Sequence, residues 1–481
     1  MLLLKHSIAV VLLLISLPLF SLEVSVTTLN YYQGEAYIEI YSRILGNSVL
    51  FAAPSVSDSL ETSQVEMLLV IKEGEKIILA DKYMIQSPPS DAPIDFWDLK
   101  RYSLENGDYK LELTYMDKNN PADTINYAKD FVVNHAAAYS SSSDILLTKD
   151  ISSDAGVYPF QKSGFFYEPL AFNLFGESDN LFAFYLELYN LQGLSEGRYY
   201  RYTIRDADTK EQVTSPAYKQ IKSQEDCLIF ESFSIEDLPS GNYELNFEVV
   251  DKARQVLHQN VQSFAIYHPL TDFKINMNPD ASFETSFVQL MNVGEVNYGL
   301  KAIFPRVRNN MSGILNSIIW SEEIEPKKYF LYSFWSKFNA ADTKALYDQY
   351  MEVAKAVDIR FTSNVGHGFE TDRGYMFLKY GQPDDLVFVE DEPSAPPYEI
   401  WIYNYLEETQ QTGVKFLFYN PSIVTNDYIL LHSTCRGELN NPQWEAQLYS
   451  KDNFENSGNA IQRTGVGDNF NRNARRYFSD F

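Results

Sequence analysis

The chain has 481 residues, of which 45% are hydrophobic and 22% charged, and its 65 acidic and 39 basic side chains give a formal net charge of -26. This composition excludes a disordered chain, which would combine low hydrophobicity with high charge, and it argues against a nucleic-acid binder, because phosphate recognition needs clustered Lys and Arg. At about 150 residues per domain, the length predicts about three domains.

The first 21 residues have the pattern of a secretory signal peptide. Lys5 and His6 precede an uncharged run from Ile8 to Phe20, and polar, alternating sequence follows at once. The run is too short to cross a bilayer, which needs about 20 apolar residues, and no later stretch is long and apolar enough. We therefore predict export and no transmembrane segment in the mature chain. Leu19 stands where a small residue is preferred before cleavage, so an uncleaved anchor is the alternative.

An internal repeat organises the first half of the chain. The stretch Gly107–Lys118 matches Gly241–Lys252 without a gap, and Tyr37–Tyr41 matches Tyr185–Tyr189 in the same order. The matched stretches alternate with period two, which is typical of half-buried strands. Short β-branched and aromatic runs, separated by turn clusters, surround them in both copies. The repeat therefore predicts two tandem β-sandwich domains of the Ig-like kind.

After Pro269 the periodicity becomes helical and then returns to that of strands. Apolar residues recur at helical spacing from Pro326 to Phe338 and again from Leu346 to Val357, and Asn339 could cap the second helix. Five strand-like runs follow, namely Tyr375–Tyr380, Leu386–Val389, Tyr398–Tyr403, Val414–Tyr419 and Tyr428–His432. Two helices followed by a run of strands predict a separate α+β domain.

These patterns predict a multidomain, mainly β chain with six segments. In chain order they are a signal peptide at 1–21, a β-sandwich at 22–134, a linker at 135–143, a second β-sandwich at 144–268, an α+β domain at 269–435 and an extension rich in Asn, Arg and aromatic residues at 436–481. The extension either wraps across the acidic domains of its own chain or docks on a partner.

Three ordered motifs in the α+β domain resemble a known family. Gly368-Phe369-Glu370-Thr371-Asp372-Arg373-Gly374 is followed by Lys379-Tyr380-Gly381-Gln382-Pro383-Asp384 and then by Tyr398-Glu399-Ile400-Trp401-Ile402-Tyr403. This region, about residues 315–435, resembles the GWxTD-domain proteins, a family of exported bacterial envelope proteins, although Phe369 stands where the family name has Trp. The family has no established activity, so the resemblance implies a fold and a periplasmic or outer-membrane-associated location but no mechanism.

The first of these motifs, from Gly368 to Gly374, is the candidate site. Its glycines, with Gly366, permit backbone angles closed to other residues, Asp372 can accept backbone N–H bonds, and Arg373 can form a fork to a carboxylate or phosphate. The motif therefore predicts a shaped loop that enters a strand and is held by its own polar groups. A ligand site at this loop is one alternative, and a catalytic pair of Asp372 with His367 or Glu370 is another.

Known active-site and metal-binding signatures are otherwise missing from the sequence. It contains no G-x-S-x-G, no H-E-x-x-H and no phosphate-binding glycine loop. The segment Asp117–Asp123 begins like a calcium loop, but Pro121 occupies its fifth position and the required Gly is absent. Cys227 and Cys435 are expected to be buried free thiols, with a bridge between domains as the alternative. We predict no catalytic residue, cofactor or metal.

The sequence favours a non-enzymatic, secreted interaction or structural component of the bacterial cell envelope, with the sandwiches as spacers or binding faces. The expected partner is another envelope protein or a glycan. One alternative is a hydrolase of envelope glycans or peptides that uses Glu370 and Asp372. The other is a carbohydrate-binding protein, in which some of the 34 Tyr stack on sugars, whereas most Tyr in alternating strands would simply pack.

Overall fold

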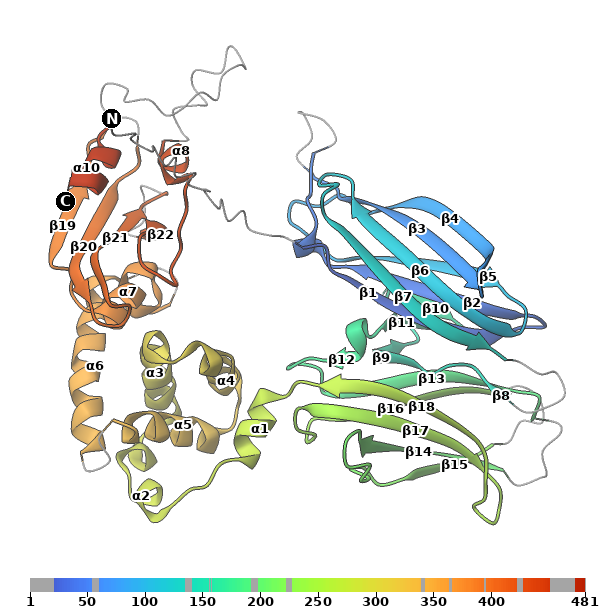
Figure 1. Ribbon diagram of the computed structural model, residues 1–481. Coiled ribbons are helices and arrows are strands. Elements are labelled where there is room, and N and C mark those ends of the chain that lie inside the picture. Colours follow the sequence, from blue (N-terminus) through green and yellow to red (C-terminus); the bar gives the residue numbers. More distant parts are fainter. Residues whose placement is uncertain are drawn as a thin grey trace, which may run out of the picture. The chain divides into compact units, whose positions relative to one another are not determined.

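The structure, a computed structural model, describes residues 21–53, 60–134, 141–154, 156, 158–191, 198–221, 227–338, 342–362, 366–392, 395–421, 427–449 and 472–480. The chain divides after Thr271 into two compact units (Figure 1). Among the described residues, every helix falls short of the length and apolarity that a membrane crossing needs. The predicted signal peptide lies outside the described residues, except for Ser21.

The first unit begins with a β-sandwich made of two antiparallel sheets, in the orders β1-β2-β5 and β4-β3-β6-β7. Its core consists of the inward-facing residues of both sheets, such as Ile38, Leu69 and Leu111. The elements are β1 (Val24–Tyr32), β2 (Ala36–Ile44), η1 (Gly46–Ser48), β3 (Gln64–Glu73), β4 (Lys76–Gln86), β5 (Phe96–Ser103), β6 (Gly107–Asp117) and β7 (Thr124–Val133).

A second β-sandwich completes the first unit, with sheets in the orders β10-β11-β9-β13-β16 and β12-β18-β17-β14-β15. Phe182, Phe184 and Phe247 belong to its separate core. The elements are β8 (Ser141–Ser142), β9 (Leu146–Ser152), β10 (Phe160–Lys162), β11 (Phe165–Pro169), η2 (Ala171–Asn173), β12 (Leu174–Phe175), β13 (Leu181–Tyr189), β14 (Tyr199–Asp206), β15 (Ala217–Gln220), β16 (Cys227–Ser234), β17 (Gly241–Val250) and β18 (Val256–Ile266).

The sequence repeat corresponds to equivalent strands of the two sandwiches. The matched stretches form β6 and β17, each of which lies between two strands of its sheet, and β2 and β13, which are likewise flanked on both sides. The Tyr at the third position of each long match makes the same contact. Tyr109 Oη donates to the carbonyl of Glu105 at 3.0 Å, and Tyr243 Oη donates to that of Pro239 at 2.8 Å. This bond back to the preceding turn is the tyrosine corner of Ig-like sandwiches, so the predicted fold of this half is confirmed.

The end of the predicted linker belongs to the second sandwich. Ser141 and Ser142 form β8 and pair with Leu188 and Tyr189 of β13. The backbone N–H of Ser143 then donates to the carbonyl of Glu187 at 2.9 Å. Small polar residues resemble a linker in sequence, yet their backbone groups can pair with a strand as well as any others. Residues 135–140 of the predicted linker lie outside the described residues.

The second unit starts with helices and ends with a four-stranded sheet. The helical elements are α1 (Pro269–Ile275), α2 (Ala281–Glu284), η4 (Phe287–Leu290), α3 (Val293–Ile303), η5 (Phe304–Arg306), α4 (Asn309–Trp320), α5 (Ile324–Ser336), α6 (Thr343–Arg360), η6 (Gly368–Glu370) and α7 (Asp372–Tyr380). The predicted α+β class is confirmed. Helix α6 contains the second predicted helix, and α5 covers the first one except for its last two residues, Lys337 and Phe338. Asn339, the expected cap, lies outside the described residues.

One predicted strand is wrong, because Tyr375–Tyr380 forms most of helix α7. The Thr371 hydroxyl accepts the N–H of Gly374 at the start of this helix, at 3.2 Å, and Gly381 ends it with a φ of 81°. A short apolar run does not by itself distinguish a helix from a strand. The segment Gly381–Asp384 consequently joins a helix to a strand, and not two strands as the sequence predicted.

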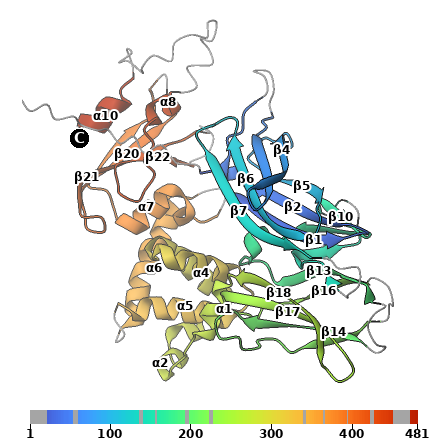
Figure 2. The ribbon, with the colours of Figure 1, turned by 45° about the vertical axis from the view of Figure 1, so that its right-hand side comes forward.

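The sheet of the second unit has the order β19-β20-β21-β22 and is covered on both faces. Helices α6 and α7 contribute to the core on one face, and the C-terminal extension packs on the other through residues such as Trp444 and Leu448 (Figure 2). The described part of the extension thus lies on its own chain. The elements are β19 (Asp385–Val389), β20 (Tyr398–Leu406), β21 (Gln411–Tyr419), β22 (Ile429–Ser433), α8 (Trp444–Leu448) and α10 (Ala474–Asp480).

Candidate functional site

The glycines of the GWxTD-like motif allow a very close approach between η6 and its neighbours. A Cβ on Gly368 would lie 2.3 Å from the carbonyl oxygen of Asp358 in α6, and a Cβ on Gly374 would lie 2.0 Å from the carbonyl oxygen of Gly368. Gly366, just before the motif, has a φ of +84°, in the region that favours glycine. The expectation of unusual backbone angles is therefore right for Gly366 and wrong for Gly368 and Gly374, which are required by packing.

Thr371 and Glu370 fix the turn between η6 and α7. The Thr371 hydroxyl donates to the carbonyl of Gly368 at 2.7 Å, in addition to capping α7. The Glu370 carboxylate accepts the backbone N–H of His367 at 2.8 Å and forms an ion pair with Lys301 of α3 at 3.0 Å. Both side chains thus satisfy backbone groups at helix starts, where the first N–H groups lack partners within the helix.

Arg373 fastens the motif to the sheet through a buried ion pair. Its Nη1 lies 2.7 Å from Oε1 of Glu399 in β20, and the other oxygen of Glu399 accepts the indole N–H of Trp401 at 2.9 Å. Arg373 is 5% exposed and Glu399 8%. The guanidinium also lies 4.1 Å from the ring centre of Tyr428, within the range of a cation–π contact. The guanidinium of Arg373, predicted to bind a carboxylate or phosphate, therefore binds the carboxylate of Glu399 in its own domain.

Asp372 makes a second connection between the motif and the sheet. Its Oδ2 accepts the backbone N–H of Leu430 in β22 at 2.6 Å. Asp372 thus accepts a backbone hydrogen bond as the sequence predicted, but from a strand 58 residues further along the chain rather than from its own turn.

The alternative catalytic pairs of this motif do not form in the structure. His367 Nδ1 lies 3.3 Å from the carboxylate of Asp358, and Glu370 pairs with Lys301. Asp372 bonds to the backbone of β22. These three side chains therefore turn to different partners and do not bond to one another.

Phe369 occupies the position of the family Trp and is buried in the core between the helices and the sheet. Its ring lies edge-on to Tyr298, with ring centres 5.2 Å apart, and stacks on His367 at 5.0 Å. These contacts require an aromatic ring and no indole N–H, which explains why Phe serves in this position.

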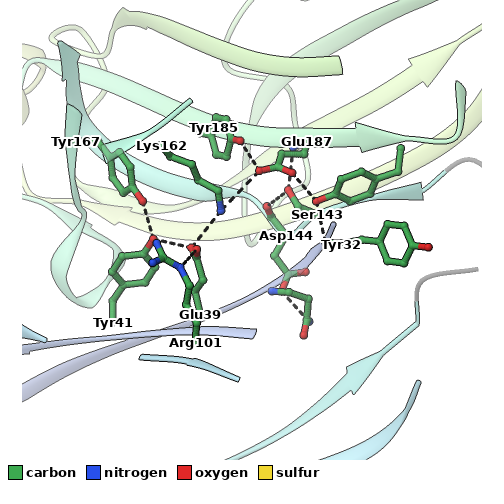
Figure 3. Close-up of polar contacts among 12 residues, drawn as sticks. Tyr32, Glu39, Tyr41, Arg101, Ser143, Asp144, Lys162, Tyr167, Tyr185 and Glu187 are labelled. Atoms are coloured by element: carbon green, nitrogen blue, oxygen red, sulfur yellow. Dashed lines mark hydrogen bonds and ion pairs between the residues drawn. The ribbon is translucent and has the colours of Figure 1, made fainter. Parts of the chain in front are cut away.

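A second site, which sequence reasoning missed, lies between the two sandwiches. The outward side chains of β2 meet those of β13, β11 and the β10–β11 hairpin (Figure 3). Residues on both faces of β2 and β13 are therefore mostly buried. We call the polar residues at this contact the inter-sandwich cluster, which consists of Glu39, Tyr41, Arg101, Lys162, Tyr167, Tyr185, Glu187 and Tyr189.

Lys162 lies at the centre of the inter-sandwich cluster. Its Nζ is 3.2 Å from the carboxylate of Glu39 in β2 and 3.6 Å from that of Glu187 in β13 (Figure 3). The ammonium also lies 3.0 Å from the ring centre of Tyr31. Burial lowers the pKa of Lys162, and the two carboxylates only partly oppose this effect. One cation thus joins a carboxylate from each sandwich.

Tyrosine hydroxyls complete the bonding of both carboxylates. Tyr41 Oη donates to Glu39 at 2.7 Å and lies 2.7 Å from Tyr167 Oη of the second sandwich. Glu187 accepts from the hydroxyls of Tyr185 and Tyr189. Burial, followed by the charge of Glu39, raises the pKa of Tyr41 far above its ordinary value. The hydroxyls therefore remain protonated donors at neutral pH.

A groove of about 820 Å³ opens beside this cluster. Its walls come from both sandwiches: Gln33 and Ser103 belong to the first, and Gln161 and Leu228 belong to the second. The Tyr-x-Glu-x-Tyr pattern, present in both copies of the repeat, was the signal that could have revealed this contact. A strand with apolar residues on one face and aromatic residues around an acid on the other has two faces to bury.

The sequence's candidate calcium loop has another role. The Asp117 carboxylate accepts the backbone N–H groups of Leu50 and Asn119, both at 2.8 Å, and Asp123 accepts that of Leu22 at 2.8 Å. Throughout the described part of the chain, no group of His, Cys, Asp and Glu side chains is arranged to hold a metal ion. Cys227 and Cys435 are free thiols, of which only Cys435 is buried.

Comparison with known proteins identifies one family, and the solved structures named here are distant likenesses. Residues 316–446 match the model of the GWxTD domain. Red sea bream transglutaminase is 10% identical with a TM-score of 0.17, over 51% of this chain and 31% of that one. The BSP domain of a biofilm associated protein is 8% identical with a TM-score of 0.16, over 53% of each chain. The fibronectin(III)-like modules of Clostridium thermocellum CbhA are 11% identical with a TM-score of 0.13, over 51% of this chain and 90% of that one.

This chain thus spans less than a third of the transglutaminase and about half of the biofilm protein's chain. At such TM-scores the likenesses carry no argument about function. No curated protein matches the chain.

Proposed function

The chain belongs to the GWxTD domain-containing proteins, and on this premise we propose that it is a non-enzymatic interaction component of the bacterial cell envelope. One observation carries the proposal, namely that the polar side chains of the motif are engaged inside their own domain. Arg373 is buried against Glu399, and Asp372 holds the backbone of Leu430. Side chains bonded in this way stabilise a fold, which is the expected role of a conspicuous motif in a protein that binds rather than catalyses.

The hydrolase alternative has less support from the same residues. A glycoside hydrolase needs two carboxyl groups that face a common substrate, and a general base must reach the proton that it removes. Glu370 pairs with Lys301 and caps the backbone of His367. Asp372 bonds to β22. The two carboxylates therefore bond to different parts of the domain and do not face a common substrate position, so we favour the interaction role.

The first unit suits an interaction role in another way. The inter-sandwich cluster joins the two sandwiches through buried polar bonds. We therefore expect them to act as one stiff spacer and not as two domains that move independently about a linker. The predicted signal peptide at 1–21 adds export to the proposal, with a periplasmic or outer-membrane-associated location. The expected partner is another envelope protein or a glycan.

Cell fractionation tests the proposed location. A C-terminally tagged full-length chain, produced in a bacterium with two membranes, is expected in the periplasmic or the outer-membrane-associated fraction. A control chain that lacks residues 1–21 should remain in the cytoplasm. Recovery of the full-length chain in the cytoplasm would refute the proposed compartment.

An incubation with purified envelope material tests the non-enzymatic role. The full-length chain is mixed with peptidoglycan and with outer-membrane vesicles, and released sugars and peptides are measured by mass spectrometry. We expect no release above buffer. Release that disappears in the double variant Glu370→Gln with Asp372→Asn would contradict this proposal and establish the hydrolase alternative.

A further inference from the structure

We propose that the groove between the two sandwiches binds a neutral oligosaccharide. This inference rests on the proposed interaction role and names the ligand class of one surface. The groove has a volume of about 820 Å³, within the usual range of roughly 300 to 1,000 Å³ for ligand pockets. Three features of the groove support a neutral oligosaccharide, namely its charge, its aromatic surfaces and the stiffness of its walls.

The charges that line the groove are nearly balanced. Three carboxylates, those of Glu35, Glu39 and Glu187, face two cations, Arg101 and Lys162. Glu39 is already bonded to both cations, with Arg101 Nε at 2.8 Å, and Glu187 is paired with Lys162. A cationic ligand would therefore have to compete with the protein's own cations for two of the three carboxylates, and an anionic ligand would enter the field of a strongly acidic chain. A neutral ligand meets neither obstacle.

Aromatic rings and polar side chains both line the groove. Half-buried rings of Tyr32, Tyr37 and Tyr102 line it, and the amide side chains of Gln33 and Gln161 are exposed at its surface. An aromatic face packs against the apolar C–H face of a sugar ring, while amides donate to and accept from its hydroxyl groups. Peptides offer fewer hydroxyls and usually carry charge, so this mixture of surfaces favours a glycan.

The walls of the groove are held in place before any ligand arrives. The ring of Tyr37 stacks on Tyr31, with ring centres 5.6 Å apart, and Tyr102 donates its hydroxyl to Asp81 at 2.8 Å. Lys162 and the Tyr41–Tyr167 contact fix the two sandwiches to each other. A ligand loses less affinity to ordering when the side chains that it contacts are already fixed.

Titration calorimetry of the full-length chain tests this inference. The neutral probes are cellohexaose, maltohexaose and the hexamer of N-acetylglucosamine. Hexagalacturonate serves as the anionic probe and hexalysine as the cationic peptide probe. We expect at least one neutral probe to bind with a Kd of about 1 mM or tighter, and the two charged probes to bind at least about tenfold more weakly.

Two groove variants and two matched controls locate the binding. Ser103→Trp places an indole in the groove from an exposed position, and the double variant Gln33→Ala with Gln161→Ala removes its amides. Each is expected to weaken the binding of the neutral probe at least about tenfold. Ser263→Trp and Gln220→Ala, at exposed strand positions of the second sandwich, should leave the binding unchanged. Thermal melts that match the parent chain confirm that the variants are folded.

Three results would overturn the inference: no neutral probe binds, hexalysine binds more tightly than every neutral probe, or the groove variants bind as well as the controls do. None of these results bears on the location or on the lack of hydrolysis, which are measured separately. The interaction role and the groove ligand can therefore fail independently.

Discussion

Gly374 is the position where we expect the addition of a single methyl group to lower stability most. A Cβ there would lie 2.0 Å from the carbonyl oxygen of Gly368 and 2.6 Å from the Cα of Phe369, and both are backbone atoms that cannot move aside. We expect Gly374→Ala to lower the free energy of unfolding of the second unit by about 3 kcal/mol. Urea denaturation of the full chain, followed by tryptophan fluorescence, measures this change, because four of the five Trp residues lie in that unit.

Gly313 in α4 is the matched control for this change. Apart from its own helix backbone and chain neighbours, a Cβ built on Gly313 meets no atom of the described residues within 4 Å, so Gly313→Ala should raise stability by roughly 0.5 to 1 kcal/mol through helix propensity alone. Equal effects of the two substitutions would show that the close approach at Gly374 does not matter.

Arg373 and Asp372 are neighbours in sequence with very different expected contributions. Arg373→Ala leaves the buried carboxylate of Glu399 without its cation and should cost about 3 to 5 kcal/mol. Asp372→Ala removes one exposed hydrogen bond to Leu430 and should cost about 1 kcal/mol. The same urea titration measures both. Adding Glu399→Gln to Arg373→Ala should recover part of the loss, and a fully additive double variant would argue against a direct pair.

At the scale of residues, the sequence predicted the type of bond better than the partner. The fork of Arg373 and the acceptor role of Asp372 follow from side-chain chemistry. Their partners, Glu399 and Leu430, lie on strands that reach the motif only when the sheet has formed. No local pattern contains that information.

Among the elements, α8 offers a test of how the C-terminal extension contributes to stability. Trp444 is 7% exposed and packs with His432 and Phe478 on the sheet face opposite α6 and α7. We expect Trp444→Ala to cost about 3 to 5 kcal/mol, because the surrounding structure fills such a cavity only in part. Differential scanning fluorimetry with an external dye should show a lower melting temperature for the second unit.

Trp320 is the matched control, since it is 85% exposed at the end of α4. Trp320→Ala should change stability by no more than about 0.5 kcal/mol. If Trp444→Ala behaved in the same way, the extension would not be an integral layer of this unit.

Elements were predictable where the sequence has both a regular hydrophobic period and clear ends. The strands of the repeat and the helices α5 and α6 have long, regular patterns. Helix α7 was mistaken for a strand, although Thr371 before it and Gly381 after it are ordinary helix ends. Helix α3 was not predicted, yet Asn292 and Glu295 form a capping box that marks its start. In short elements the ends carry more information than the period.

For the whole first unit, the buried tyrosines predict sensitivity to alkali. Burial raises the pKa of Tyr41 and Tyr167 above the ordinary value of about 10. Above pH 10 the unfolded chain loses these protons while the folded chain keeps them, so stability falls as pH rises. Lys162, whose pKa is lowered, acts in the opposite sense, because its contribution improves as pH rises towards its unfolded value of about 10.5. Several tyrosines outweigh one lysine, and the net change is a loss.

Urea midpoints between pH 8 and pH 11 measure this loss, together with the absorbance of ionised tyrosine near 295 nm. We expect the midpoint to fall above pH 10, and Tyr41→Phe to reduce the steepness of that fall. Tyr267→Phe, at a residue 52% exposed, serves as the control. If all tyrosines titrated near pH 10 with no change in the midpoint, the cluster would not be a buried part of the fold.

At the scale of the whole molecule, the sequence predicted the sandwiches but not their joining. Each has its own core, as the repeat implied. The predicted linker suggested two separate bodies, whereas a third apolar cluster, which includes Tyr31, Tyr41 and Tyr185, is shared between them. Outward-facing tyrosines are as compatible with solvent as with another sheet, so only the facing surface decides their role.

The contact between the two sandwiches uses the repeated strand of each copy, β2 in the first and β13 in the second. The same strand, with the same Tyr-x-Glu-x-Tyr pattern, provides the contact face in both copies. Two identical subunits that associate about a two-fold axis also use one patch twice. The two sandwiches of this chain are instead joined covalently, so each can contribute different side chains to their contact. The ammonium of Lys162, for example, comes from the second sandwich and lies near a carboxylate from each of them.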